Sequence, residues 1–118
     1  MKPASAKAKG RTLQKLVVSA ILDLHPELTK NDVRSTSMGA QGVDVQLSEA
    51  ALKVFPYAVE CKNKARYAVY ADYAQAVENA NGYTPLLVIK QNQSQPLVML
   101  SLVDFMKLLR VYKENNTA

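Results

Sequence analysis

The first strong pattern along the chain is a stripe of apolar residues that begins just after Thr12. Apolar side chains recur there at helical spacing: Leu13, Leu16, Val17, Ala20, Ile21 and Leu24. Positions three and four apart lie on one face of a helix, so this spacing predicts an amphipathic helix. The helix should end near His25, because Pro26 disfavours the α conformation in the residue before it.

The middle of the chain alternates apolar and polar positions, which is typical of half-buried strands. Residues 43–48 alternate strictly, and residues 57–62 follow after a connection, so two strands are predicted. Residues 35–42 hold two glycines and three hydroxyl side chains, which indicates a loop in front of the first strand.

The last third of the chain predicts a helix, two strands and a final helix. The first helix is predicted over 72–81, with Asp72 as its cap and Gly82 as its stop signal. Strands are predicted over 85–90 and 97–100. The final helix starts from a Ser101/Asp104 capping box, and its apolar face carries Phe105, Leu108, Leu109 and Tyr112. The predicted order is α-β-β-α-β-β-α. It describes an α/β fold of the mixed α+β kind, with a central mixed sheet flanked by helices.

Length and cysteine content narrow the class of protein. A chain of 118 residues with 48% apolar content forms one domain, predicted over residues 11–118. A single cysteine excludes an internal disulfide. No apolar stretch approaches the roughly 18 residues of a membrane span, so we expect a cytoplasmic protein with no membrane partner. No phosphate-binding loop or dinucleotide fingerprint is present, so no small-molecule cofactor is expected.

The positive charge is concentrated at the start of the chain. The net charge is +5, and residues 1–16 carry five basic residues and no acid: Lys2, Lys7, Lys9, Arg11 and Lys15. Residues 1–10 show no apolar period, so we predict a flexible basic arm there. Such an arm binds a polyanion or acts only as a solubilising tail, and charge alone favours neither.

Strand periodicity brings three charged residues onto one surface. Glu60 and Lys62 share a strand face, and Asp44 would meet them if the two strands pair. Two converging carboxylates repel each other unless they share a proton or a cation, and oxygen ligands suit Mg²⁺. By itself, a Glu-x-Lys pair on a strand is more often a solvated ion pair than a catalytic pair.

These residues resemble a known nuclease signature. Gly42-Val43-Asp44, followed after sixteen residues by Glu60-Cys61-Lys62, is similar to the PD-(D/E)XK motif, with Val43 in place of the proline. The wider context resembles the small Holliday-junction resolvases of archaea and their phage-encoded relatives. That similarity covers most of the chain: Lys9-Gly10-Arg11 before the first helix, Ser37-Met38-Gly39 before the Asp44 strand, and the segments 70–79 and 85–90.

The resemblance implies a restriction-endonuclease-like fold and a metal-dependent DNA endonuclease that resolves four-way junctions as a homodimer. For a phage-encoded protein, the compartment would be the host cytoplasm. Asp44 and Glu60 would bind Mg²⁺, for which Mn²⁺ should substitute, and the Cys61 carbonyl would complete the metal site. Lys62 would orient or activate the attacking water. The family's first helix commonly offers a glutamate to the metal, where this chain has Gln14.

Several assignments stay open at the level of sequence. Gln75 matches a polar position near the site in these nucleases, but it is equally the third helical residue of a capping box begun by Asp72. Cys61 should face the core, and the first helix is a possible dimer surface. The tyrosines at 67, 70 and 73 could stack on bases, although packing is the commoner role. The residues expected to contact DNA are Lys7, Lys9, Arg11, Lys15, Ser37, Gly39, Lys64 and Arg66.

Two other functions fit the same residues. One is a nuclease of the same fold that acts on other branched, nicked or plain duplex DNA. The other is a non-catalytic nucleic-acid-binding module in which the acids form a structural ion pair.

Overall fold

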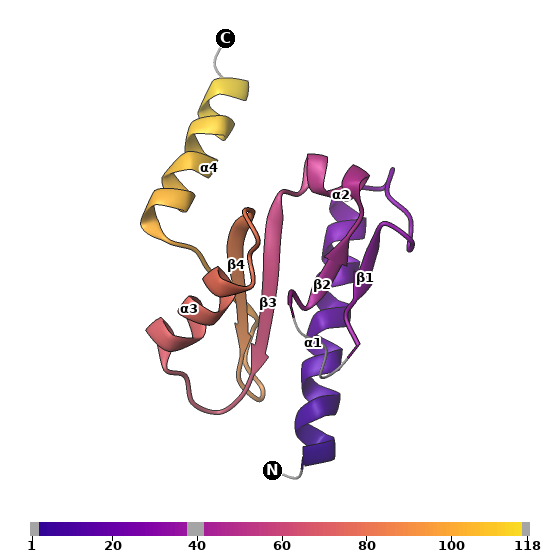
Figure 1. Ribbon diagram of the computed structural model, residues 1–118, viewed down its shortest axis with the longest axis vertical. Helices are drawn as coiled ribbons and strands as arrows, with labels where there is room; N and C mark the ends of the chain where they lie inside the picture. The colour runs from indigo at the N-terminus through magenta and orange to yellow at the C-terminus, as the bar shows by residue number, and fades with distance from the viewer. Residues whose placement is uncertain (1–2, 38–41, 117–118) are drawn as a thin grey trace.

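The computed structural model describes residues 3–37 and 42–116 (Figure 1). Its elements, in chain order, are α1 (Pro3–Leu24), β1 (Val33–Ser35), β2 (Val45–Leu47), α2 (Glu49–Val54), β3 (Tyr57–Asn63), α3 (Val69–Glu78), β4 (Thr84–Lys90), β5 (Leu97–Met99) and α4 (Leu102–Asn115). The fold is α+β, with a mixed sheet flanked by helices, as the sequence predicts. No helix within the described ranges is both long and apolar enough to cross a membrane.

The strands of the described residues form two sheets rather than one. In the larger sheet, β3 pairs in parallel with β4, and β5 pairs antiparallel to the other edge of β4. In the smaller sheet, β1 and β2 pair antiparallel, with Arg34 opposite Gln46. The pairing of the Asp44 strand with the Glu60 strand, which was the condition for bringing their charged residues together, does not form, because β2 forms its ladder with β1.

The core lies between α1 and the two sheets. Leu13, Val17 and Ile21, from the predicted apolar stripe, are buried there. They pack with buried side chains from β1, β2, α2, β3 and β4: Val33, Val45, Ala51, Val59, Cys61 and Val88. Each fully buried side chain of this size contributes about 1.5–3 kcal/mol. Half of the stripe proposed as a possible dimer surface is thus buried inside its own chain, whereas Leu16, Ala20 and Leu24 are exposed.

Helix α1 begins earlier than the sequence pattern indicates. The predicted flexible arm covers residues 1–10, but its described part, from Pro3 onwards, continues α1 without a break. Alanine and lysine have high helix propensity even without an apolar period, and proline is well suited to the first helical turn. Periodicity reports the buried face of a helix, so it overlooked this helical extension, in which none of residues 7–10 is fully buried.

Two short elements escaped the sequence analysis. Strand β1 has three residues, and α2 occupies what was predicted to be a plain connection over residues 49–56. Helix α2 has a clear start, because the Ser48 hydroxyl accepts a hydrogen bond from the Ala51 N–H at 3.1 Å. The predicted strand 43–48 is correspondingly reduced to Val45–Leu47.

Helix α3 starts three residues before its predicted cap. Its N-cap is Ala68, and Asp72 lies inside the helix, buried, with its carboxylate 2.8 Å from the Lys64 ammonium. The helix ends at Glu78, and the chain then turns through Asn81 and Gly82, both at positive φ. The predicted helix end at residue 81 is therefore three residues too late, and the C-cap is Asn79 rather than Gly82. Asp72 is not a cap either.

Helix α4 stands apart from the sheets and extends toward the C-terminus (Figure 1). Its predicted start is confirmed, because the Ser101 hydroxyl accepts a hydrogen bond from the Asp104 N–H at 3.0 Å. Among the described residues, however, α4 buries no side chain. Its exposed apolar residues are Leu102, Val103, Phe105, Met106, Leu108, Leu109, Val111 and Tyr112.

Candidate active site

Asp44 lies where the two sheets come closest. Its N–H donates to the Val59 carbonyl at 2.9 Å, and its carboxylate accepts from the Cys61 N–H at 2.7 Å. On the other side, its carbonyl accepts from the Thr36 N–H at 2.9 Å. Asp44 therefore contacts the edge of β3 that β4 does not occupy, although the two segments do not pair as strands. One of its carboxylate oxygens is fixed by the β3 backbone.

Glu60 lies next to Asp44 and is almost completely buried, with a relative exposure of 5%. Its carboxylate accepts from the Asn79 side-chain amide at 3.1 Å and lies 4.0 Å from the Lys62 ammonium. Burial, followed by the negative charge of Asp44, raises the pKa of Glu60 from 4.5 to about 7, although Asn79 and Lys62 act in the opposite direction. Near neutral pH the Glu60 carboxyl is therefore partly protonated, and a bound cation could displace that proton.

The candidate residues line one cavity of about 530 Å³. Its lining comes from α1, the start of β2, β3 and α3: Gly10, Gln14, Gly42, Asp44, Glu60, Cys61, Lys62, Gln75, Glu78 and Asn79. The structure thus brings together Asp44, Glu60 and Lys62, as the strand periodicity predicts, and it adds Gln14 and Gln75 from two helices. The convergence comes from the Asp44 contacts to β3 and not from a hairpin.

The cavity presents oxygen atoms that suit a hard divalent cation. The N–H and C=O of one strand residue point to the same edge, so the Cys61 carbonyl faces the edge where its N–H meets Asp44. Gln14 is 4% exposed, and its side-chain oxygen has no hydrogen-bond partner among the described residues. No group of three or more His, Cys, Asp or Glu side chains is placed to hold a metal in the described ranges, so two carboxylates, neutral oxygens and water would form the site. This ligand set fits Mg²⁺, which retains several waters.

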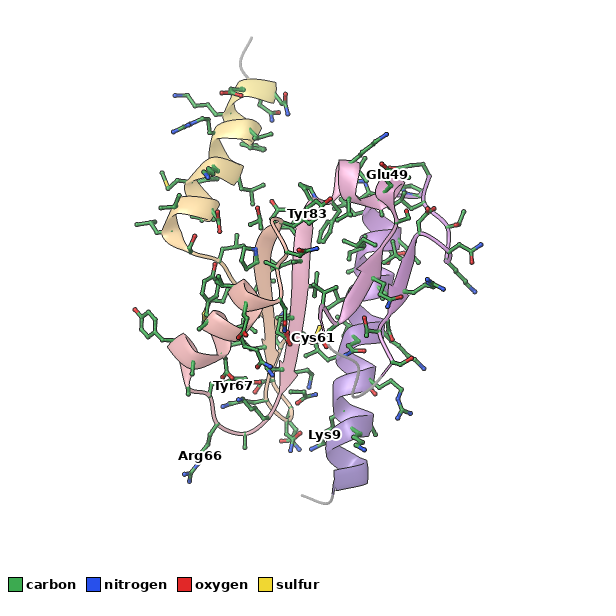
Figure 2. The ribbon with its side chains drawn as sticks, viewed as in Figure 1. Lys9, Glu49, Cys61, Arg66, Tyr67 and Tyr83 are labelled. Carbon is green, nitrogen blue, oxygen red and sulfur yellow. The ribbon has the colours of Figure 1, made fainter. Side chains whose placement is uncertain are left out.

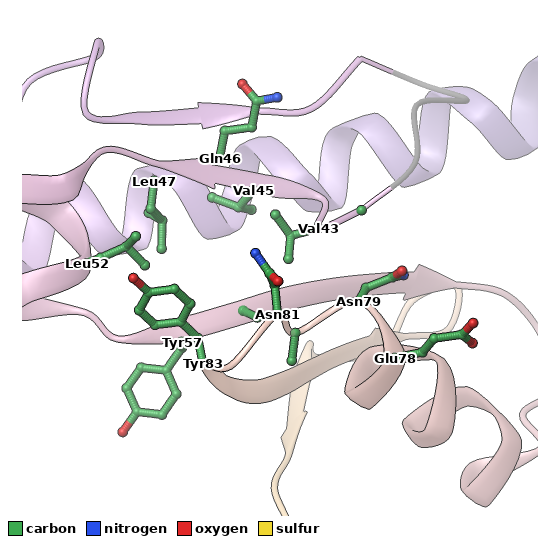
Figure 3. Close-up of a pocket in the computed structure, with 13 residues that line it drawn as sticks. Val43, Val45, Gln46, Leu47, Leu52, Tyr57, Glu78, Asn79, Asn81 and Tyr83 are labelled. Atoms are coloured by element: carbon green, nitrogen blue, oxygen red, sulfur yellow. The ribbon is translucent and has the colours of Figure 1, made fainter.

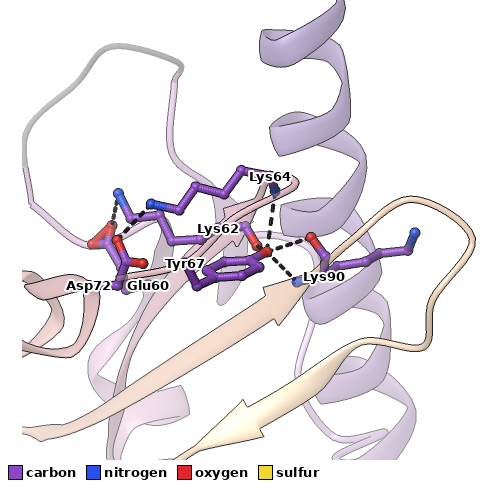
Figure 4. A network of polar contacts seen from close by, with 6 residues as sticks. All are labelled: Glu60, Lys62, Lys64, Tyr67, Asp72 and Lys90. Carbon is purple, nitrogen blue, oxygen red and sulfur yellow. Dashed lines mark hydrogen bonds and ion pairs between the residues drawn. The ribbon is translucent and has the colours of Figure 1, made fainter. Parts of the chain in front are cut away.

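The backbone of Lys62 is held by a tyrosine at the ends of β3 and β4 (Figure 4). The Tyr67 hydroxyl lies within hydrogen-bond distance of the Lys62 carbonyl, at 2.8 Å, and of the Lys90 carbonyl. The same oxygen accepts from the N–H groups of Lys90, at 2.9 Å, and Lys64, at 3.2 Å. Tyr67 therefore joins the two strands, which supports the packing role and leaves its hydroxyl engaged.

The other two tyrosines of the predicted cluster lie in different surroundings. Tyr73 is half-buried and accepts a hydrogen bond from the Ser101 N–H at 3.2 Å. Tyr70 is 90% exposed on α3. The three rings therefore do not act as one stacking surface.

The structure excludes one of the two interpretations of Gln75. Because α3 starts at Val69, Gln75 lies in the second turn and cannot be the third residue of a capping box. Its side chain lines the cavity instead. Sequence reasoning missed Asn79, which holds Glu60, and Glu78. Asn79 follows Gln75 by four residues, so the same helix face could have indicated it.

Most of the predicted DNA-binding residues lie on the surface. Lys7, Arg11, Lys15, Ser37 and Arg66 are exposed, whereas Gly39 lies outside the described residues. The Lys9 ammonium donates to the Asn92 side-chain oxygen at 2.6 Å, and Lys64 is paired with Asp72. Lys9 and Arg66 lie toward the same end of the molecule, with Cys61 farther inside (Figure 2).

Cys61 is buried in the core, as predicted for its side chain. Burial and the nearby carboxylates raise the pKa of its thiol well above the usual range. The thiol is therefore protonated and unreactive at neutral pH. Only its backbone takes part in the candidate site.

Comparisons with protein families, curated proteins and solved structures found no match to this chain.

Proposed function

We propose that the protein is a metal-dependent DNA endonuclease of the PD-(D/E)XK kind that resolves four-way junctions. The supporting observation is the convergence of the Asp44 and Glu60 carboxylates with Lys62 in one cavity at the free edge of β3. The restriction-endonuclease-like arrangement of the strands is part of this proposal.

In the proposed reaction, Asp44 and Glu60 hold the cation, together with the Cys61 carbonyl. Mg²⁺, when bound, would neutralise phosphate charge and make a water more acidic. Lys62, whose ammonium lies 4.0 Å from Glu60, orients the attacking water and stabilises the negative charge that develops on the phosphate oxygens. The amides of Gln14 and Gln75 hold water or phosphate oxygens around the centre, and Asn79 keeps Glu60 in position.

A four-way junction has two-fold symmetry and requires two cuts, so we propose that a homodimer fixes two active sites relative to each other. We therefore expect paired, symmetry-related nicks near the branch point and little cutting of a matched duplex. Strand-by-strand mapping on a four-way junction, a nicked duplex and a plain duplex, with Mg²⁺, Mn²⁺ or EDTA, tests this, and light scattering gives the oligomeric state.

The outcomes separate the alternatives. A monomer that nicks duplex and junction equally well would be a nuclease without junction specificity. DNA binding with no cleavage in either metal would indicate a non-catalytic module. Cleavage that persists in EDTA would contradict the proposed role of Asp44 and Glu60.

The basic start of α1 should supply phosphate contacts that do not depend on DNA shape. Deleting residues 1–9 removes Lys2, Lys7 and Lys9. Affinity should fall about equally for junction and duplex, and the slope of log K against log salt should fall by up to about 2.7 if all three contact phosphates. Fluorescence anisotropy at several salt concentrations measures both quantities.

A charge-only variant separates charge from helix length. Lys2→Gln, Lys7→Gln and Lys9→Gln together keep the helix and should reproduce the loss of slope. The matched control neutralises three exposed lysines elsewhere, Lys30, Lys53 and Lys107. An unchanged slope in the first variant would identify the segment as a passive tail.

A further inference from the structure

A second cavity, of about 590 Å³, opens beside the candidate active site (Figure 3). After Asp44, β2 turns to pair with β1 and leaves β3, and the space between the two sheets is this cavity. The two cavities share Gly42, Glu78 and Asn79 in their linings. The second cavity therefore adjoins the one that holds Asp44 and Glu60.

The walls of this cavity suit a flat, uncharged group. One wall is aliphatic, formed by Val43, Val45, Leu47 and Leu52, and the aromatic rings of Tyr57 and Tyr83 belong to the same lining. None of the described lining residues is a lysine, arginine or histidine, and Glu78 adds a carboxylate, so the cavity offers a phosphate no cationic side chain. Nucleobases stack on aromatic and apolar faces in this way.

A polar group is available to read the edge of such a base. Asn81 follows α3 with a φ of 49°, and Figure 3 shows its side chain extending toward Val43 and Val45. Its amide makes no hydrogen bond to any other described residue. An amide presents both a donor and an acceptor, which is the usual means of recognising the edge of an unpaired base.

We propose that this cavity binds an unpaired nucleobase next to the scissile phosphate. This inference rests on the proposed nuclease function and specifies its substrate: DNA in which one nucleotide at the cleavage site is unstacked, as at a branch point. Val43, Leu47 and Tyr83 enclose the base, and the Asn81 amide contacts its edge. Enzymes that act on an extruded nucleotide hold its base between aromatic or apolar side chains and hydrogen-bond its edge.

The test uses binding, so it does not depend on cleavage. A four-way junction carries one abasic site, which is moved nucleotide by nucleotide through the branch region. Affinity is measured by anisotropy with Ca²⁺ in place of Mg²⁺. At one position the missing base should weaken binding about tenfold, because stacking contributes about 1–3 kcal/mol per base.

Variants connect that loss to the cavity. Tyr83→Leu removes the ring from a residue that is 42% exposed, and Asn81→Gly removes the amide at a position where glycine accepts a positive φ. Each variant should bind the intact and the abasic junction with about the same affinity. Tyr70→Leu, at a 90% exposed tyrosine outside the cavity, should keep the tenfold difference.

Each result is decisive. An abasic series with no effect at any position, or a full effect retained in both cavity variants, would overturn the inference while leaving the nuclease proposal intact. A base-dependent loss that the wild type shows and the two cavity variants lack would support it, even in a protein that does not cleave. Absence of any DNA binding by the wild type would overturn both proposals.

Discussion

Replacement of Asp44 by asparagine, Glu60 by glutamine or Lys62 by alanine is expected to abolish cleavage and to leave DNA binding nearly intact. The three groups line one cavity, and a positioned catalytic group contributes about 10²–10⁴-fold to a rate. Each carboxylate variant also removes negative charge next to the phosphate, so metal-free binding should be maintained or improved. Single-turnover cleavage of a four-way junction, together with anisotropy in EDTA, measures the two effects.

Matched controls lie on α2, outside the cavity. Glu49→Gln and Lys53→Ala remove the same kinds of charge from exposed positions and should cleave like the wild type. A variant at 44, 60 or 62 that cleaves within about tenfold of wild type would show that its residue is not catalytic.

Glu60→Gln should also stabilise the metal-free protein at high pH. The folded-state pKa of Glu60 is raised from 4.5 to about 7, so ionisation of this group opposes folding. Its favourable contribution is complete below about pH 4.5 and is lost as the pH rises through 7. This difference between the folded-state and unfolded-state pKa corresponds to at most about 3 kcal/mol in the free energy of unfolding. The variant should therefore unfold like the wild type at pH 4 and gain up to that amount at pH 8.

Urea denaturation at pH 4, 6 and 8 in EDTA measures this difference, with Glu49→Gln as the control. Adding Mg²⁺ at pH 8 should stabilise the wild type, because the cation offsets the repulsion between the ionised Asp44 and Glu60 carboxylates. It should stabilise the variant much less. Equal stability of wild type and Glu60→Gln at pH 8 would contradict the buried, coupled environment of Glu60.

Strand periodicity was sufficient to predict which face carries the candidate chemistry. Alternation alone places Glu60 and Lys62 on one face of β3 and Cys61 on the other, and both placements agree with the structure. The pairing partner of β2 could not be predicted from the sequence. Strand β1 has three residues, and its one buried residue, Val33, produces no periodic signal. Asp44 nevertheless reaches Glu60 through two hydrogen bonds to the β3 backbone, which no local pattern encodes.

The start of α3 illustrates a different limit of local patterns. An aspartate before an apolar run is a good cap signal, but Asp72 is buried in a pair with Lys64, eight residues earlier. That pair forms only after the segment between β3 and α3 has folded back. Gln75 could be placed in the cavity only once the true start of α3 was known.

The isolation of α4 has a consequence for how the unfolding of this protein should be followed. A helix that buries none of its side chains can open while the core between α1 and the sheets remains closed. In a single copy of the chain, the amide hydrogens of Leu102–Asn115 should therefore exchange with solvent through local opening, far faster than those of β3 and β4. Far-ultraviolet circular dichroism would sum both events, so its transition would be broader than one reported by the core alone.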